Sequence, residues 1–252
     1  MKKLYYFGIS MLIIHILSLS LISCEKSVEN PDYSDNSGEF KDNRDGKIYK
    51  WLKFGDQIWM GENLNFTGDN GFQIHITDDT EWVNNKNGSG WSYYNNNPDY
   101  ATTYGVLYQW EAAKKACPEG WHLPSDDEWS ILDEFLSLNG YSCDGIIGGK
   151  KTAKSLATAT GWEYSDIPYS IGNTDYPEYK NKTGFSVLPA GTRSYHDGKF
   201  HSIGSSTGLW SSTSTNYDPE QARQYGLGKS TDYGVHEPSM KLSGYSIRCI
   251  KD

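Results

Sequence analysis

The pattern of apolar and polar positions divides the chain into three parts. An apolar run over residues 4–22 follows Lys2 and Lys3, and residues 25–45 are mostly polar and acidic. From residue 46 onward, short apolar stretches alternate with turn residues, as they do in a folded domain. We therefore expect a signal peptide over residues 1–23, a flexible acidic tether over 24–45 and one domain over 46–252.

The domain begins with a predicted hairpin. Apolar residues dominate 47–54 and 57–60, and Gly55-Asp56 between them is a favoured two-residue hairpin loop. The next segment, residues 65–97, is rich in Asn, Gly, Asp and Ser and carries scattered aromatic residues. We predict a long loop there, anchored by its aromatic side chains.

The clearest helix signal begins at Ser125. Ser125 and Glu128 have the spacing of a capping box, and the apolar residues that follow recur at helical spacing. Asn139-Gly140 supplies the predicted end of this helix. Shorter helices are expected in the second half of 104–116 and near 150–159.

Short strands are predicted beyond residue 163, where glycine and proline punctuate β-prone pieces. In the last piece, Tyr245, Ile247 and Cys249 alternate with Ser246 and Arg248, which predicts a half-buried strand. Early helices and late short strands predict an α+β domain. The expected strands are 184–188, 193–195, 199–203, 209–213, 221–226 and 245–250.

Composition narrows the class of protein. The 252 residues include 9 Trp, 19 Tyr and 8 Phe, which argues against a disordered chain although only 37% of residues are hydrophobic. The formal net charge is −9. Phosphate contacts need an excess of Lys and Arg, so we expect no nucleic-acid partner.

The N-terminal run has the basic and apolar regions of a secretory signal. It ends in Leu21-Ile22-Ser23-Cys24, which resembles the bacterial lipobox, whose cysteine is lipidated and becomes N-terminal. The resemblance implies lipidation of Cys24, an extracytoplasmic location and membrane attachment through the lipid. An uncleaved signal anchor is the alternative, because the run approaches the roughly 20 residues that span a bilayer.

Three cysteines remain if Cys24 carries lipid. They are Cys117, Cys143 and Cys249. In an oxidising compartment we expect one disulfide and one leftover thiol, and the residues alone permit all three pairings.

Six short segments, in order, carry a family resemblance over about residues 45–252. They are residues 57–64, 104–112, 117–129, 184–193, 209–213 and 246–249. Together they resemble the Fibrobacter succinogenes major paralogous domain family. Membership implies a lipoprotein anchored to the bacterial outer membrane, on its surface or periplasmic face, and it implies no established activity.

A more distant resemblance concerns architecture. Residues 110–117 and 123–129 look like the two-helix portion of C-type-lectin-like and formylglycine-generating-enzyme domains. This resemblance implies a C-type-lectin-like α+β fold, with two or three short helices, a twisted antiparallel sheet and long loops. In C-type lectins a cysteine on the first helix pairs with one on the last strand, which implies a Cys117–Cys249 disulfide here. The lectins' calcium motif is missing, so we expect no calcium and no other cofactor.

The sequence shows no catalytic constellation. Residues 204–208 match G-x-S-x-G, but a nucleophile elbow needs a following helix, and a β-prone piece follows here. His196 and His201 flank a predicted hairpin without a third zinc ligand. His122 is interpreted as a structural residue, and no His or Lys adjoins Cys143 to activate it. We therefore expect a protein that is not an enzyme and holds no metal.

The aromatic residues of the 65–100 segment suggest a ligand surface. Flat rings among amides and carboxylates are typical of sugar-binding sites, although such rings also pin loops to a core. We expect a lipid-anchored binding or adhesion module for a glycan or surface protein, using loops in 65–100 and 205–240. The alternatives are a formylglycine-generating-enzyme-like enzyme with a low-pKa thiol, or a structural cell-surface component with no small ligand. The candidate ligand-binding residues are Trp82, Trp91, Tyr93, Tyr94 and Tyr100.

Overall fold

The computed structural model describes Met1, residues 35–68 and residues 72–252. The chain divides into two units, Met1–Asn30 and Pro31–Asp252, and the folded elements all belong to the second. The predictions for the signal peptide, for Cys24 and for the tether up to residue 34 lie outside the described residues. In the part that is described, no helix has the length and apolar character needed to cross a bilayer.

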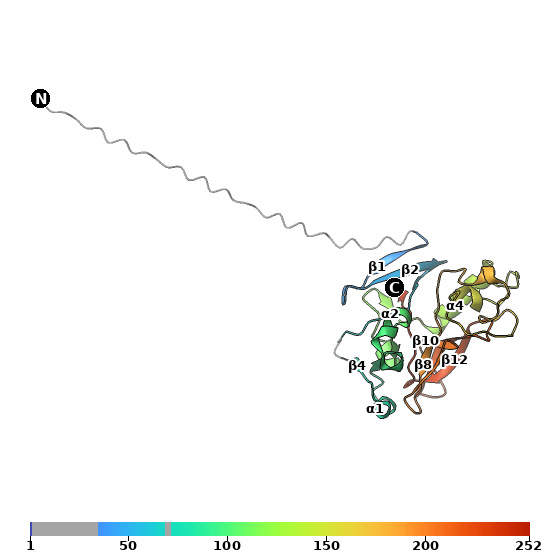
Figure 1. Ribbon diagram of the computed structural model, residues 1–252. Coiled ribbons are helices and arrows are strands. Elements are labelled where there is room, and N and C mark those ends of the chain that lie inside the picture. The colour runs from blue at the N-terminus through green and yellow to red at the C-terminus, as the bar shows by residue number, and fades with distance from the viewer. Residues whose placement is uncertain (2–34, 69–71) are drawn as a thin grey trace. The chain divides into compact units, whose positions relative to one another are not determined.

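The first sheet joins both ends of the described domain. Its strand order is β1-β2-β3-β13-β7, and every neighbouring pair is antiparallel. Phe54 pairs with Gln57 across the two-residue loop, which confirms the predicted hairpin. The C-terminal strand β13 lies between β3 and β7, and Figure 1 shows the C-terminus at the same end of the domain as the labels of β1 and β2. The strands are β1 (Ser37–Lys41), β2 (Ile48–Phe54), β3 (Gln57–Met60), β7 (Trp121–His122) and β13 (Ile250–Lys251).

The folded part of the chain includes strand β1, which lies before the predicted boundary at residue 46. Phe40 is 6% exposed and stacks on Trp121, with ring centroids 4.4 Å apart. Asp42 is buried and accepts hydrogen bonds from the guanidinium of Arg44. The tether prediction is therefore wrong for residues 37–45. The buried ring and the main-chain ladder offset the entropy that this short segment loses on ordering.

The second sheet has the order β12-β11-β10-β8-β9. Strand β8 runs parallel to β10, and the other neighbours are antiparallel. Three expected strands are confirmed as β9, β10 and β11, whereas β8 lies earlier than expected and β12 was not predicted. The expected strand over 184–188 contributes only a single bridge at Val187. The strands are β8 (Ala190–Arg193), β9 (Phe200–Ile203), β10 (Ser206–Ser214), β11 (Gln221–Gly228) and β12 (Val235–Met240).

The segment predicted as a long loop contains short elements instead. Strands β4 and β5 lie within it, and β5 pairs in parallel with β4 and antiparallel with the later strand β6, in a small sheet of order β4-β5-β6. The elements within the predicted loop are β4 (Ile74–His75), α1 (Asp79–Asn84), β5 (Gly90–Ser92) and η1 (Tyr94–Asn96), and they are followed by η2 (Pro98–Tyr100), α2 (Ala101–Tyr104) and β6 (Leu107–Tyr108).

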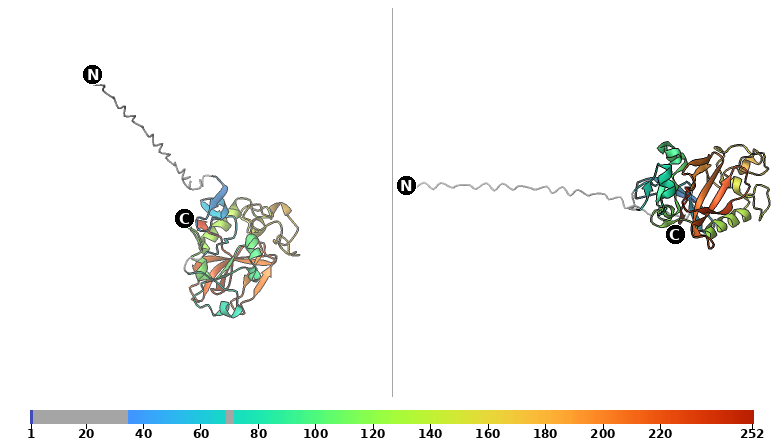
Figure 2. Two further views of the ribbon diagram at one scale, coloured as in Figure 1. Left: turned by 60° about the vertical axis from the view of Figure 1, so that its left-hand side comes forward. Right: turned by 90° about the horizontal axis from the view of Figure 1, so that it is seen from below.

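Helix α4 (Asp126–Leu138) confirms the predicted capping-box helix. The Ser125 N–H donates to the Glu128 carboxylate at 2.7 Å, and the Glu128 N–H donates to the Ser125 hydroxyl at 3.2 Å. Its buried face packs against β10 and β11 through Trp129, Leu132 and Leu136. Figure 2 shows α4 alongside the strands of the second sheet. The remaining helices are α3 (Trp110–Ala113), α5 (Ala153–Leu156) and η3 (Pro177–Tyr179).

Short helices with antiparallel and mixed sheets make this an α+β domain, as expected. Cys117 and Cys249 form a disulfide with their Cα atoms 5.8 Å apart, which confirms the pairing implied by the resemblance. Cys143 is a free, buried thiol.

The last predicted strand is wrong over most of its length. Only its end, at β13, pairs as a strand, and the residues before it form single bridges to neighbouring segments. Ser246 and Arg248, expected on an exposed face, are fully buried. The segment is buried on both faces. The alternating pattern predicted that one face is exposed to solvent, but the 184–188 loop covers that face.

Candidate functional site

Three of the five rings expected to bind a ligand are part of the core. Trp82 is 0% exposed, and Trp91 and Tyr94 are each 6% exposed. Tyr93 and Tyr100 are half-buried. The buried three therefore do not form the stacking surface expected from the sequence.

Two of these rings pack on distant parts of the chain, and the third packs on a residue of the neighbouring strand. The guanidinium of Arg193 lies 4.3 Å from the Trp82 ring centroid. Trp91 stacks on His75 at 4.1 Å, and Tyr94 contacts Phe200 at 5.3 Å. The contacts of Trp82 and Tyr94 attach the 74–100 segment to the second sheet, which is the structural alternative noted for these rings.

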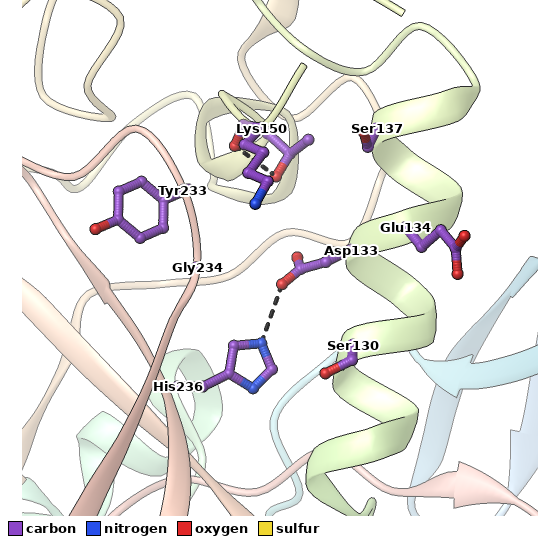
Figure 3. A pocket seen from close by; sticks show the side chains of 9 residues that line it. Ser130, Asp133, Glu134, Ser137, Lys150, Tyr233, Gly234 and His236 are labelled. Atoms are coloured by element: carbon purple, nitrogen blue, oxygen red, sulfur yellow. Dashed lines mark hydrogen bonds and ion pairs between the residues drawn. The ribbon is translucent and has the colours of Figure 1, made fainter. Parts of the chain in front are cut away.

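A different part of the molecule offers a hollow of about 430 Å³. Helix α4 forms one side, and β12 with the residues before it forms the other (Figure 3). Most of the lining residues have polar side chains, although carbon atoms form the larger part of the lining surface, and Tyr233 contributes a phenol ring. The lining residues are Ser130, Asp133, Glu134, Ser137, Lys150, Thr152, Tyr233, Gly234 and His236.

A histidine held between two carboxylates joins the two sides. One ring nitrogen of His236 lies 2.7 Å from Oδ1 of Asp126, and the other lies 3.1 Å from Oδ2 of Asp133. Because both partners are acceptors, the doubly protonated ring satisfies both of them. The hydrogen bonds to Asp133 and Asp126 raise the pKa of His236 above its ordinary value, although burial opposes this.

A row of buried aromatic rings leads to this network and ends in a hydrogen bond to Asp133. Trp59 contacts Trp129 with ring centroids 4.5 Å apart, and Trp129 stacks on Tyr225 at 4.5 Å with an interplanar angle of 5°. The Tyr225 hydroxyl donates to Oδ1 of Asp133 at 2.6 Å. Burial and the neighbouring Asp133 charge raise the pKa of Tyr225 well above its ordinary value, so the phenol remains a proton donor. The carboxylate of Asp133 is thus fixed in place from two directions.

Gly234 lets the strand approach this network. A Cβ atom at Gly234 would overlap the ring and hydroxyl of Tyr225. The missing side chain therefore allows β12 to bring His236 within hydrogen-bond distance of α4.

The exposed groups of the hollow suit binding of a polar molecule. Tyr233 is 51% exposed, and in Figure 3 its ring lies across the hollow from Asp133. The Lys150 side chain enters between them, whereas Glu134 points away. His236 has both ring nitrogens occupied by carboxylates, so in this arrangement it has no free lone pair with which to accept a proton from a substrate.

The other histidines singled out in the sequence have structural surroundings. His122 bridges Asp252 at 2.6 Å and Glu128 at 2.8 Å. Burial opposes its charged form, but the two hydrogen bonds outweigh this and raise the pKa of His122. His201 forms a surface pair with Asp197 at 3.6 Å. Within 35–68 and 72–252, no group of three or more His, Cys, Asp or Glu side chains is arranged so that it could hold a metal ion.

Two further sequence features are placed by the structure. Gly204-Ser205 forms a turn that leads directly into β10, so the helix required by a nucleophile elbow does not follow. Cys143 is 1% exposed, and burial raises the pKa of its thiol to about 11.

The sequence reasoning missed the hollow because β12 was not recognised. Its residues Val235–Met240 include His, Glu, Pro and Ser, which hides the strand pattern. One signal was available on the helix side. Asp126 and Asp133 are seven residues apart, a spacing that places both carboxylates on one face of α4.

Comparisons with known proteins identify a domain family. A family model described as the Fibrobacter succinogenes major domain matches residues 52–251. Neither the curated proteins nor the solved structures gave a match to this chain.

Proposed function

The chain belongs to the Fibrobacter succinogenes major domain family, and from this premise we propose that it is a glycan-binding module whose site is the α4–β12 hollow. The family supplies no activity, so the proposal rests on the chemistry of the hollow. Its ligand would be one or two saccharide units of an extracellular polysaccharide.

The combination of groups in the hollow supports a sugar. An exposed tyrosine ring can cover the apolar C–H face of a pyranose, while carboxylate, ammonium and hydroxyl groups bond to its hydroxyls. Tyr233 supplies the ring, and Asp133 and Lys150 supply charged hydrogen-bonding groups. A volume of about 430 Å³ is within the range of small-molecule sites.

The observation that carries the proposal is the rigid support of Asp133. Its two oxygens are held by Tyr225 at 2.6 Å and His236 at 3.1 Å. A carboxylate fixed before the ligand arrives loses little conformational freedom on binding. Such a group beside an exposed ring favours recognition over a purely structural role for this surface.

We propose the same cellular setting that the sequence indicated. Lipidation at Cys24 would hold the domain on the outer membrane, on its surface or periplasmic face. The domain would then present the hollow to glycans outside the cytoplasm. The C-type-lectin-like version of the α+β fold also stays a proposal, and the disulfide that joins Cys117 to the segment before β13 supports it.

A glycan array with the purified domain tests the proposal, followed by titration of any glycan that binds. We expect Tyr233→Ala to weaken binding at least tenfold through loss of the stacking ring. Tyr164→Ala is the matched control, because Tyr164 is 67% exposed and lies outside the lining of the hollow. Equal losses in both variants, or no glycan bound by the parent protein, would refute a sugar site here.

The enzyme alternative needs a reactive thiol, and Cys143 does not meet that need. Its burial and its pKa of about 11 leave little thiolate at neutral pH. Labelling with a thiol reagent tests this directly. Slow labelling of the native protein and fast labelling after unfolding would leave binding as the proposed role.

A further inference from the structure

A second hollow lies on another part of the domain and has a volume of about 550 Å³. Four of the six segments that carry the family resemblance contribute to its lining. They contribute Glu62 and Asn63, Gly105, Ser186 and Leu188, and Arg248. None of these residues belongs to the α4–β12 hollow.

Arg248 is the unusual member of this lining. It is 0% exposed, and its guanidinium donates to the side-chain oxygen of Asn63 at 2.9 Å. It also donates to the carbonyl oxygens of Phe185 and Ser186. These bonds use three of the five N–H groups of an arginine. All three acceptors are neutral, so the positive charge is hydrogen-bonded without being neutralised.

Two other cations of the domain are equally buried and show the contrast. Arg193 reaches the carboxylate of Asp79 at 3.3 Å, and Lys154 pairs with the carboxylate of Asp175. Both are 0% exposed. For Arg248, no carboxylate of the described residues lies within ion-pair distance, and the nearest acidic influence is the more distant charge of Glu62. Buried charges are normally paired, because an unpaired charge loses its hydration without compensation.

We propose that the hollow beside Arg248 binds the carboxylate of an acidic sugar, with Arg248 as its counter-charge. The rim offers the Lys47 ammonium and the hydroxyls of Thr102 and Thr103. A carboxylate accepts two hydrogen bonds from one guanidinium, and the sugar hydroxyls can bond to the threonines. This site is independent of the glycan site proposed at α4 and β12.

The charge balance favours a carboxylate over a phosphate. Lys47 already pairs with Asp45 at 3.2 Å, and Glu62 adds a negative charge to the rim. Arg248 is therefore the one cation of the lining without a carboxylate partner among the described residues. A single positive charge matches a monoanion better than a phosphate of charge near −2.

Isothermal titration of the domain with sodium glucuronate tests the proposal, with glucose and inorganic phosphate as parallel probes. We expect glucuronate to bind at least tenfold more tightly than glucose or phosphate. Equal affinity for glucuronate and glucose, tighter binding of phosphate, or no binding of glucuronate would overturn the proposal.

Rim variants locate the binding without disturbing the buried arginine. Glu62→Gln removes a repulsive charge and should tighten glucuronate binding about two- to five-fold, and Lys47→Gln should weaken it by a similar factor. Lys229→Gln is the charge-matched control, because Lys229 pairs with Glu163 and lies outside this lining. If Glu62→Gln and Lys47→Gln behave like the control, glucuronate binds elsewhere and the proposal fails.

Arg248→Lys supplies the direct test in a variant that keeps the charge. Lysine cannot reproduce the planar fork, so glucuronate binding should fall at least tenfold. Tyr233→Ala should leave glucuronate binding unchanged, which separates this site from the α4–β12 hollow. If Tyr233→Ala weakens glucuronate binding, the anion binds in the α4–β12 hollow and the assignment to Arg248 is wrong.

Discussion

At Gly234 the chain passes so close to Tyr225 that a Cβ atom would overlap the phenol ring. Gly234→Ala therefore forces β12 or Tyr225 to move and separates the groups that hold Asp133. We expect a loss of about 1–3 kcal/mol in the free energy of unfolding, as for other overpacked sites. Urea unfolding followed by tryptophan fluorescence measures it.

Gly228→Ala is the control for this change. Gly228 ends β11, and the nearest atom to its Cβ position is Cγ2 of Thr231 at 3.6 Å. This variant should stay within about 0.5 kcal/mol of the parent protein. Equal stability of Gly234→Ala and Gly228→Ala would show that the close approach at Tyr225 is unimportant.

His236 makes stability depend on pH. Its pKa is raised by hydrogen bonds to Asp133 and Asp126, so the native state binds the proton more tightly than the unfolded chain. This stabilisation is complete below the unfolded pKa of about 6.5 and is lost as the pH rises through the raised native value. His236→Gln should cost about 1–3 kcal/mol at pH 6 and less at pH 9.

Thermal unfolding between pH 5.5 and 9 tests this prediction. His201→Gln is a suitable control, because the His201 ring is half exposed and its contact with Asp197 is 3.6 Å long. If the pH profile of His236→Gln runs parallel to that of the parent protein, the two carboxylates do not bind the imidazolium as described.

For single residues, covalent and hydrogen-bonding roles were easier to predict from the sequence than burial. The architectural resemblance to C-type lectins implied the partner of Cys117, and His122 is hydrogen-bonded on both ring nitrogens, as expected of a structural residue. Burial of Trp82 and Arg248 could not be read from the sequence, because each is covered by segments more than 60 residues away. An alternating apolar and polar pattern shows which face of a strand packs on the core. It does not show whether another segment covers the opposite face.

Among the secondary-structure elements, α4 is central to the candidate site because it carries Asp126 and Asp133. Its first turn depends on the Ser125–Glu128 capping box. Ser125→Ala should lower the free energy of unfolding by about 1 kcal/mol. Ser137→Ala lies in the last turn of the same helix, far from the cap, and should have little effect, because alanine has the higher helix propensity.

Chemical denaturation of the two serine variants compares them directly. A Ser125→Ala protein as stable as Ser137→Ala would show that the cap does not determine the start of α4.

Elements with local signals were predictable, and elements defined by distant partners were not. The 55–56 hairpin and α4 are encoded by a turn dipeptide and a cap within a few residues. Strand β12 contains Pro238 and little apolar character, and it exists because β11 pairs along its length. Strands β4, β5 and β6 have two or three residues each, too short for any periodicity.

For the whole molecule, β1 shows where the domain begins. A chain starting at residue 46 loses the Phe40 ring and the ladder between β1 and β2. Compared with a chain starting at residue 35, it should be less stable by about 3 kcal/mol or more, the usual cost of removing a buried phenylalanine. Calorimetry of the two chains distinguishes a structural strand from a tether that extends to residue 45, because a tether would leave the two stabilities equal.

At the same scale, the fold class was predictable from the order of helices and strands, and the position of the hollow was not. The hollow forms where the loop before β12 faces α4, about 100 residues away along the chain. Its proposed ligand follows from side-chain chemistry that becomes apparent only when Tyr233, Asp133 and Lys150 are seen together.

Chemical-shift mapping tests the central claim most directly. The ¹⁵N-labelled domain would be titrated with the best-binding glycan, and the perturbed amides would be assigned. The proposed site predicts that the largest changes fall in residues 130–137 and 233–236. Changes concentrated in residues 74–100, or no saturable changes with any glycan, would contradict it.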